Sequence, residues 1–308
     1  MVKFSFLLPA YKGRFLKKML CSIRNQTYSN FKCIISDDCS PDNIYSICQP
    51  FLQDSRFIYR RNDENMGKKD LVSHWNLLVD LCDTEYLILA SDDDVYDKYF
   101  LEKINELTKK YPEAGLLRAR VNHIDEDDNL LTYESIYPER VTQIEFMAQI
   151  HNNMFSMCIA NAVFKTEALK RIGGFVNYPF AWFSDNATMI IMSKTGCINT
   201  SENLFKYRDS ALAISSSKSQ KQSIKKIEAA ISYHKWFVSF IGKYAESKSD
   251  YERYLFNYTV KCHYESMRSH IYDLLSTCSL FDMLRMLPKI VSAGLGSKVG
   301  LISSFLRR

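Results

Sequence analysis

The sequence lacks the motifs that mark several common classes of protein. Its nine cysteines are scattered and never form Cys-x-x-Cys, which argues against a disulfide framework or a zinc cluster and is typical of buried thiols in a reducing compartment. Neither Gly-x-Gly-x-x-Gly nor Gly-x-x-x-x-Gly-Lys-Ser/Thr occurs, so the usual glycine-rich phosphate cradles are unsupported. The six histidines include no pair with a convincing metal-ligand spacing.

Long apolar runs are absent as well. No stretch of about eighteen apolar residues is present, and the first apolar segment is halted by Pro9, too early for a signal peptide. We therefore expect a cytosolic protein without a membrane span. The net charge of +5 over 308 residues is mild and does not by itself indicate a nucleic-acid partner.

What is present is an alternation of short apolar runs with helical periodicity. Residues 3–8 and 31–36 have the character of buried parallel strands, and the apolar spacing of residues 14–24 between them predicts a helix. The same reading predicts further strands at 56–60, 85–90 and 114–121, and helices at 44–52, 71–82 and 98–110. Such alternation predicts an α/β fold with a mostly parallel central sheet flanked by helices.

The pattern changes after residue 121. Residues 122–129 are acidic and turn-like, and a hairpin and helices at 142–150 and 185–193 are expected beyond them. Residues 208–222, rich in serine and lysine, are a candidate linker or mobile loop. From about residue 223 onward only helical patterning remains. We thus predict one domain over 1–215, whose pattern changes between a half at 1–121 and a half at 122–215, and a helical C-terminal region over 216–308.

Three consecutive carboxylates, Asp92, Asp93 and Asp94, follow the strand predicted at 85–90. Like charges this close raise one another's pKa unless a cation or several donors lie among them. One interpretation is a divalent-metal site at the end of a buried strand, where open α/β sheets bind their ligands. The other is a solvated acidic turn that caps the helix beginning near Asp97.

Other polar and aromatic groups follow the remaining predicted strands. Because the ends of parallel strands meet at one edge of a sheet, these groups should converge with the acidic triplet. They suit a base, a ribose and a metal-bound diphosphate: Pro9-Ala10-Tyr11 after the first strand, Asp37-Asp38-Cys39-Ser40 after the second and Asn65-Met66-Gly67 after the third.

With these segments, the chain resembles family 2 glycosyltransferases with the GT-A fold, an inverting group that includes bacterial polysaccharide-building enzymes. The resemblance covers roughly residues 3–210 in the family's order, and it implies a catalytic domain over 1–215 with a nucleotide-binding half at 1–121 and an acceptor-side half at 122–215. It rests on Leu7-Leu8-Pro9-Ala10-Tyr11, Ser22-Ile23-Arg24-Asn25-Gln26-Thr27-Tyr28, Ile34-Ile35-Ser36-Asp37-Asp38-Cys39-Ser40-Pro41-Asp42, Asn65-Met66-Gly67, Ala90-Ser91-Asp92-Asp93-Asp94-Val95-Tyr96, Ile172-Gly173-Gly174-Phe175 and Ser184-Asp185.

The resemblance implies roles for individual residues. Asp92 is implied as the acid nearest the donor ribose, and Asp93 or Asp94 as the ligand of Mg²⁺ or Mn²⁺ on the diphosphate. A one-residue alignment choice separates these assignments, and the family's additional acid before its Asp-Asp pair is replaced here by Ala90. The implied nucleotide-binding set is Pro9, Ala10, Tyr11, Asp38, Gly67, Asp92 and Arg208.

On the acceptor side, the family has a Glu-Asp pair shortly after Gly-Gly-Phe, where this chain has Ser184-Asp185. The resemblance implies that Asp185 is the base that deprotonates the acceptor hydroxyl; capping the following helix is the simpler alternative. Arg208 either closes over the diphosphate or is a surface arginine. Trp182 either forms part of the acceptor wall, since aromatic faces suit sugars, or packs in the core.

The resulting hypothesis is an inverting, metal-dependent glycosyltransferase that uses a nucleotide sugar, with UDP the expected nucleotide. Its acceptor is a hydroxyl on a glycan or lipid-linked saccharide in capsule, O-antigen or similar envelope polysaccharide synthesis. A sugar nucleotidyltransferase and an inactive nucleotide- or glycan-binding scaffold are the alternatives. The basic amphipathic stretch over 279–308 either contacts the inner face of the cytoplasmic membrane or packs on the protein.

Overall fold

The computed structural model describes residues 2–210 and 220–297. The chain divides into two compact units, each described here by itself. The first unit comprises Met1–Gln143, Phe155–Val176 and Thr188–Ser210. The second comprises Ile144–Met154, Asn177–Ala187 and the chain from Ala211 onward.

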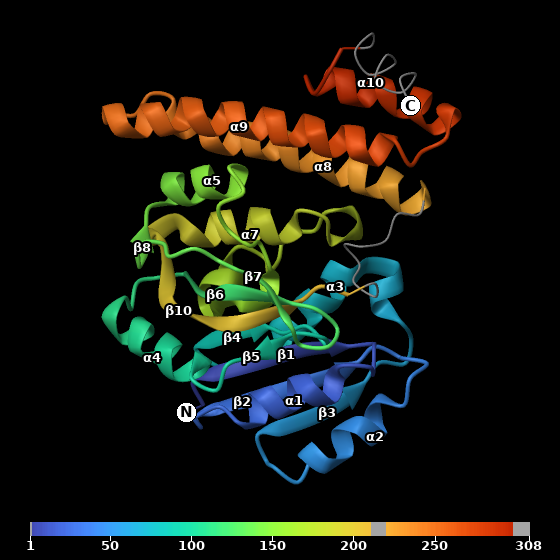
Figure 1. The fold of residues 1–308 in the computed structure, drawn as a ribbon, viewed down its shortest axis with the longest axis vertical. Coiled ribbons are helices and arrows are strands. Elements are labelled where there is room, and N and C mark those ends of the chain that lie inside the picture. Colours follow the sequence, from blue (N-terminus) through green and yellow to red (C-terminus); the bar gives the residue numbers. More distant parts are fainter. Residues whose placement is uncertain (1, 211–219, 298–308) are drawn as a thin grey trace. The chain divides into compact units, whose positions relative to one another are not determined.

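The first unit is built on the sheet seen in Figure 1. Its described strands follow the order β3-β2-β1-β4-β9-β6-β10-β5, with β7 beside β6 and β8 beside β10. The strands are β1 (Phe4–Ala10), β2 (Phe31–Asp37), β3 (Phe57–Arg61), β4 (Tyr86–Leu89), β5 (Val95–Tyr96), β6 (Leu116–Ile124), β7 (Leu130–Tyr133), β8 (Arg140–Val141), β9 (Ala162–Lys165) and β10 (Cys197–Arg208).

The sheet is parallel through β3, β2, β1 and β4, as the alternating pattern predicted. It becomes mixed beyond β4, because β9 runs antiparallel between β4 and β6. The sheet is therefore less uniformly parallel than expected. The hairpin expected beyond residue 129 was misplaced: a hairpin forms between β6 and β7, and the acidic segment that follows residue 124 is its turn.

The helices of the first unit include α1 (Leu16–Arg24), α2 (Ile44–Cys48), α3 (Met66–Leu81), α4 (Phe100–Lys110) and α6 (Thr166–Arg171), with 3₁₀ turns at Gln49–Phe51, Ile159–Asn161 and Ser193–Thr195. The apolar faces of α1, α2 and α4 share one buried core with alternate residues of β1, namely Phe4, Phe6 and Leu8. Burying such faces is what holds helices of this length in place. This core fixes the strand ends at which the predicted site residues lie.

The Gly-Gly-Phe motif shows why glycine is required at one position. Gly173 and Gly174 both have positive φ, at +88° and +87°, after α6 ends. A Cβ on Gly174 would lie 2.4 Å from Oδ1 of Asn76, the atom that accepts the Phe175 amide proton. The motif thus forms a turn that hydrogen bonds to the Asn76 side chain of α3 hold in place.

The second unit is helical in its described part. It contains α8 (Gln220–Ile241), α9 (Asp250–Leu275), α10 (Leu280–Ser292) and 3₁₀ turns at Pro179–Ala181 and Gly242–Tyr244. Two further helices, α5 (Gln143–His151) and α7 (Ser184–Met192), begin or end in it. The helical patterning expected beyond residue 223 is confirmed by α8, α9 and α10, the last of which ends at Ser292. Most of the predicted linker at 208–222 and the last part of the basic tail lie outside the described residues.

Candidate functional site

The ends of β1, β2 and β4 bring the predicted nucleotide-side residues to one edge of the sheet. Ala10 pairs with Asp37 in the β1–β2 register, and the Ala90 amide donates to the Leu7 carbonyl beside β1. The Asp38 amide likewise donates to Ala10. The turns that follow the three strands therefore lie next to one another, as their position after parallel strands predicted.

Asp92 ties the acidic triplet to the turn after β1. Its Oδ2 accepts hydrogen bonds from the backbone amides of Tyr11 at 3.0 Å and Lys12 at 2.7 Å. Oδ1 lies 3.6 Å from the Lys12 ammonium. Asp92 is buried, whereas Tyr11 is 41% exposed. The carboxylate shapes the turn while the aromatic ring remains open to a ligand.

Asp93 and Asp94 are buried as well and are held by different groups. Asp93 accepts from Ser91 Oγ through Oδ1 and lies 3.2 Å from the Lys12 ammonium through Oδ2. Asp94 Oδ1 accepts from the Arg208 amide at 2.9 Å. Asp92 and Asp93 thus share the Lys12 ammonium, whereas Asp94 is held by the end of β10, and these contacts oppose the mutual repulsion of the three charges.

Burial dominates the electrostatics of the triplet. It raises the pKa of Asp92, with Lys12 opposing the rise and Asp93 adding to it. The pKa of Asp94 is raised well above its usual range, first by burial and then by the neighbouring Asp93. Burial and mutual repulsion therefore destabilise the ionised carboxylates of the triplet, and a bound cation would stabilise them.

Arg208 lies at the end of β10 with its side chain fully buried. Its Nε donates to the Asp93 carbonyl at 2.8 Å, Nη1 donates to the Asp125 carbonyl at 2.7 Å, and Nη2 pairs with Asp128 at 2.6 Å. The guanidinium also lies 4.4 Å from the centre of the Phe15 ring. Arg208 is thus neither exposed nor on a free surface, and it holds the backbone of the triplet in place.

Asp38 is engaged by the turn between β3 and α3. Its carboxylate accepts from Asn62 Nδ2 and the Met66 amide, each at 2.9 Å, and from the Gly67 amide at 2.8 Å. A Cβ on Gly67 would come within 3.0 Å of Asp38 Oδ2, so the glycine permits this approach. Asp38 and Gly67 are brought together as predicted, in a contact that orders the loop beside the strand ends.

The donor set of the triplet suits a hard divalent cation, but it is incomplete by itself. Within residues 2–210 and 220–297, no group of three or more His, Cys, Asp or Glu side chains is arranged to hold a metal ion. Mg²⁺ commonly takes only one or two protein carboxylates and completes its shell with water and substrate phosphates. The carboxylates of Asp93 and Asp94 fit that partial role.

Asp185 and Trp182 lie in the second unit, close to an unusual turn. Phe180, Ala181 and Phe183 have φ values of 63°, 55° and 66°, a region that non-glycine residues rarely occupy. Such strain recurs at functional sites, where surrounding contacts must maintain it. Here one such contact is the Phe183 ring, which stacks on Tyr233 at 4.7 Å.

Asp185 lies at the start of α7. The residue as a whole is partly exposed, but its carboxyl group is buried, and this burial raises its pKa to about 6. Its Oδ1 accepts from the Asn186 amide at 2.8 Å, so it also contributes to the helix start. Trp182 donates from Nε1 to His270 at 2.7 Å, and the Lys226 ammonium lies 4.1 Å from its ring centre. A carboxylate with a pKa near 6 is suited to accept a proton at neutral pH.

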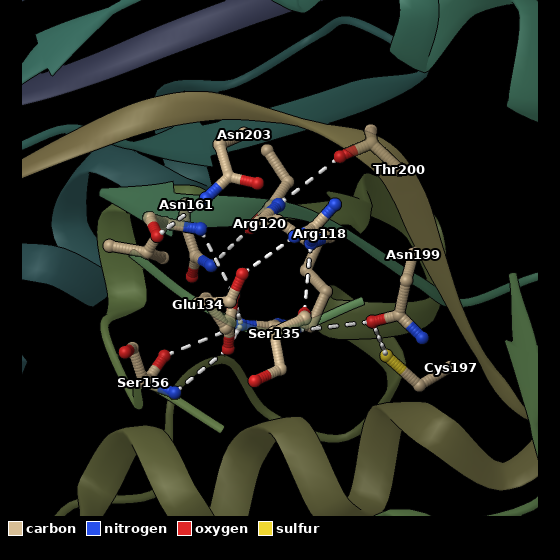
Figure 2. Close-up of polar contacts among 12 residues, drawn as sticks. Arg118, Arg120, Glu134, Ser135, Ser156, Asn161, Cys197, Asn199, Thr200 and Asn203 are labelled. Carbon is tan, nitrogen blue, oxygen red and sulfur yellow. Dashed lines mark hydrogen bonds and ion pairs between the residues drawn. The ribbon is translucent and has the colours of Figure 1, made fainter. Parts of the chain in front are cut away.

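The sequence did not single out Lys12 or a buried polar cluster in the first unit (Figure 2). In that cluster Arg118 of β6 donates from Nη2 to both Glu134 oxygens, at 2.7 and 2.9 Å, and both side chains are buried. Glu134 also accepts from the amides of Val121 and Ser156. The pair fixes the segment after β7 against β6. Lys12 had one local signal, its position directly after Tyr11 at a strand end.

Comparison with known proteins identifies relatives. The family model described as glycosyl transferase family 2 matches residues 5–173. Glycosyltransferase GlyG of Streptococcus pneumoniae serotype 4 (strain ATCC BAA-334 / TIGR4) is 25% identical over 130 residues, which are 42% of this chain and 42% of that protein. The aligned part thus spans less than half the length of this curated relative.

Solved structures show the same fold. TarS residues 1–349 of S. aureus, in complex with UDP-GlcNAc, superposes with a TM-score of 0.68 over 98% of this chain and 89% of that chain, at 13% identity. The mannosyltransferase PcManGT of Pyrobaculum calidifontis, in complex with GDP-Man and Mn²⁺, gives 0.58 over 99% and 86%, at 12% identity. At such identities the likeness establishes the fold, and the expected GT-A architecture is confirmed.

Proposed function

Because the chain belongs to glycosyl transferase family 2, we propose that it transfers a sugar from a nucleotide-diphosphate sugar to an acceptor hydroxyl with inversion at the anomeric carbon. The observation that carries this proposal is the buried Asp92-Asp93-Asp94 triplet, tied to the exposed Tyr11 at the ends of β1 and β4. UDP is our choice of nucleotide, supported by the UDP-GlcNAc complex of TarS.

On the donor side, we assign binding of the nucleotide base to the turn of Pro9, Ala10 and Tyr11. Asp38 and Gly67 shape the neighbouring loop between β3 and α3. Asp92 is assigned to the ribose, and Asp93 and Asp94 to a divalent cation. Bound there, Mg²⁺ or Mn²⁺ would neutralise the departing diphosphate; PcManGT was solved with Mn²⁺. A direct diphosphate contact by Arg208 would require its guanidinium to leave the Asp125 carbonyl and Asp128, so we assign it the positioning of the triplet instead.

On the acceptor side, we assign Asp185 as general base and Trp182 to the sugar-binding wall. The carboxylate removes the proton from the acceptor hydroxyl as the oxygen attacks the anomeric carbon. Its pKa of about 6 leaves it ionised at neutral pH and still basic enough to take a proton. We assign the nucleotide-binding half to 1–121, the acceptor-side half to 122–215 and the helical region to 216–308.

We further propose that the acceptor is a glycan or lipid-linked saccharide of the cell envelope and that the protein works on the inner face of the cytoplasmic membrane. No helix of the described residues is long and apolar enough to cross a membrane. On α10, Leu280, Phe281 and Leu284 are 53%, 75% and 50% exposed, beside the exposed Arg285. An exposed apolar face beside a cation suits an anionic lipid surface.

A donor screen tests the reaction. The full chain is incubated with a panel of UDP-, GDP- and TDP-sugars, with Mn²⁺, with Mg²⁺ or with EDTA, and release of the nucleoside diphosphate is measured. We expect one donor to be hydrolysed in a metal-dependent manner. Asp93→Asn with Asp94→Asn should abolish the release, whereas Asp83→Asn, which changes an exposed acid paired with Lys32, should not.

No hydrolysis of any donor, together with unchanged nucleotide binding by the Asp93→Asn and Asp94→Asn variant, would contradict a metal-dependent transferase. That result would favour an inactive nucleotide- or glycan-binding scaffold. Formation of a nucleotide sugar from a nucleoside triphosphate and a sugar phosphate would instead identify a nucleotidyltransferase.

A further inference from the structure

Lys12 places a cation among the carboxylates of the triplet. Its ammonium lies 3.2 Å from Asp93 Oδ2 and 3.6 Å from Asp92 Oδ1, and its backbone amide donates to Asp92 Oδ2. The Lys12 side chain is 30% exposed, whereas those of Asp92 and Asp93 are 7% and 11% exposed. Lys12 is therefore a cation with a path to solvent that neutralises an almost buried acidic pair.

The contacts of Asp93 limit where a second cation can bind. Its Oδ1 already accepts from Ser91 Oγ, and Oδ2 is the oxygen that the ammonium contacts. A divalent ion on Oδ2 would lie within a few ångströms of the ammonium. Two such cations repel strongly in a partly buried site, because the interaction is weakly screened there. Metal binding to this oxygen therefore requires the ammonium to move away.

We propose that Lys12 is the resident counter-cation of Asp92 and Asp93 and exchanges with the divalent cation, so that this residue sets the metal affinity of the site. The inference rests on the metal-dependent part of the proposed function. The displaced ammonium remains next to Tyr11, at the turn assigned to the nucleotide, where its charge favours an anionic diphosphate. Lys12 should thus oppose metal binding and favour nucleotide binding.

Direct binding measurements on the full chain test the exchange. Mn²⁺ is titrated into metal-free protein without nucleotide, and free Mn²⁺ is followed by its electron paramagnetic resonance signal. Lys12→Gln and Lys12→Met should each bind Mn²⁺ about fivefold more tightly, the factor that corresponds to about 1 kcal/mol for a partly exposed ion pair. Lys12→Arg, which keeps the charge, should stay near the wild-type affinity.

Lys110→Gln is the matched control, because it removes one positive charge from an ion pair of the same unit, with Glu139. An equal gain in Mn²⁺ affinity in Lys110→Gln and Lys12→Gln would reduce the effect to net charge and overturn the inference. So would unchanged Mn²⁺ affinity in both neutral Lys12 variants.

A second titration uses UDP at a Mn²⁺ concentration that saturates every variant, because the ammonium is displaced toward the nucleotide only when the metal is bound. Lys12→Gln should weaken UDP binding severalfold while it tightens Mn²⁺ binding, and a loss of packing alone would not produce these opposite signs. Tighter UDP binding by Lys12→Gln would also overturn the exchange. If wild type binds Mn²⁺ and the Lys12 variants do not differ from it, only this inference fails. If no variant binds Mn²⁺, the metal part of the proposed function fails with it.

Discussion

At the scale of single residues, the ionisation of Asp185 should set the pH dependence of the proposed sugar transfer. Burial raises the pKa of its carboxyl group from 3.8 to about 6. A general base must be ionised, so transfer should fall about tenfold per pH unit below pH 6 and level off above it. The kcat/KM of transfer, measured from pH 4.5 to 8 with the donor identified in the screen, checks this. A pH-independent rate across that range would remove Asp185 from the role.

The variant Asp185→Asn sharpens the same test. It should lower transfer by about 10²–10⁴-fold and leave donor-nucleotide binding intact. It should not lower the midpoint of thermal unfolding at pH 8, because a carboxyl whose folded pKa is raised costs stability once it is ionised. Asp273→Asn, which changes an exposed acid of α9, is the control and should leave the rate unchanged.

Residue by residue, the sequence located the cluster at the strand ends but not all the contacts within it. Asp92, Asp93 and Asp94 could be placed beside Tyr11, because apolar runs mark strands and parallel strand ends share an edge. The burial of Arg208 could not be foreseen, since its partners at Asp93 and Asp125 lie more than eighty residues away in the chain. Local patterns carry no information on such long-range partners.

At the scale of elements, a chain of buried histidines connects the helices of the second unit. Tyr233 Oη lies 3.2 Å from His151 Nε2, His151 Nδ1 lies 3.4 Å from His263 Nδ1, and His263 Nε2 lies 2.9 Å from His234 Nδ1. His234 Nε2 ends the chain 2.9 Å from the Ala293 carbonyl. Burial lowers the pKa of each ring and keeps it neutral. Because a carbonyl only accepts, each neutral ring then donates in the same direction, starting from the Tyr233 hydroxyl.

Acid should therefore destabilise this unit. Burial lowers the pKa of His151 to about 3 and lowers those of His234 and His263, whereas unfolded histidine titrates near 6.5. A depressed folded pKa means that the unfolded state binds more protons below about pH 6.5. The stabilisation is thus complete above that pH and is lost as the pH falls, by up to about 1.4 kcal/mol per pH unit for each neutral histidine.

Hydrogen exchange of α8 and α9 peptides at pH 7, 6 and 5, corrected for the intrinsic rate, measures this loss. Protection should decrease toward pH 5 in wild type and decrease less in His263→Gln, which has one buried imidazole fewer. His123→Asn, in the first unit, should follow wild type. Protection that does not change between pH 7 and 5 would show that the histidines do not titrate in this way.

The elements themselves were predictable where periodicity was strong. The apolar spacing of residues 14–24 and 98–110 gave α1 and α4 to within two residues, and β1, β2 and β4 follow from continuous apolar runs. The antiparallel insertion of β9 between β4 and β6 was not predicted. Strand direction and neighbour order depend on packing between distant segments, which periodicity does not encode.

At the scale of the whole molecule, the exposed apolar residues of α10 are the basis of the proposed contact with a membrane surface. Met283, Met286, Leu287 and Ile290 are buried, so Leu280, Phe281 and Leu284 are not needed to fill the core around α10. Phe281, at 75% exposed, is among the most exposed large hydrophobic side chains of the described residues. Residues 298–308, which complete the basic tail expected from the sequence, lie outside the described part of the chain.

We therefore expect the full chain to co-sediment with vesicles containing phosphatidylglycerol, and to do so less at high salt, because charge attraction to anionic lipid is screened. Phe281→Glu with Leu284→Glu should weaken the association at least tenfold, since both apolar insertion and charge attraction are reduced. Leu130→Glu with Leu131→Glu makes the same change at two exposed leucines of β7 in the first unit and is the control. Equal binding by all three proteins would exclude α10 as the contact, and equal loss in both double variants would reduce the effect to net charge.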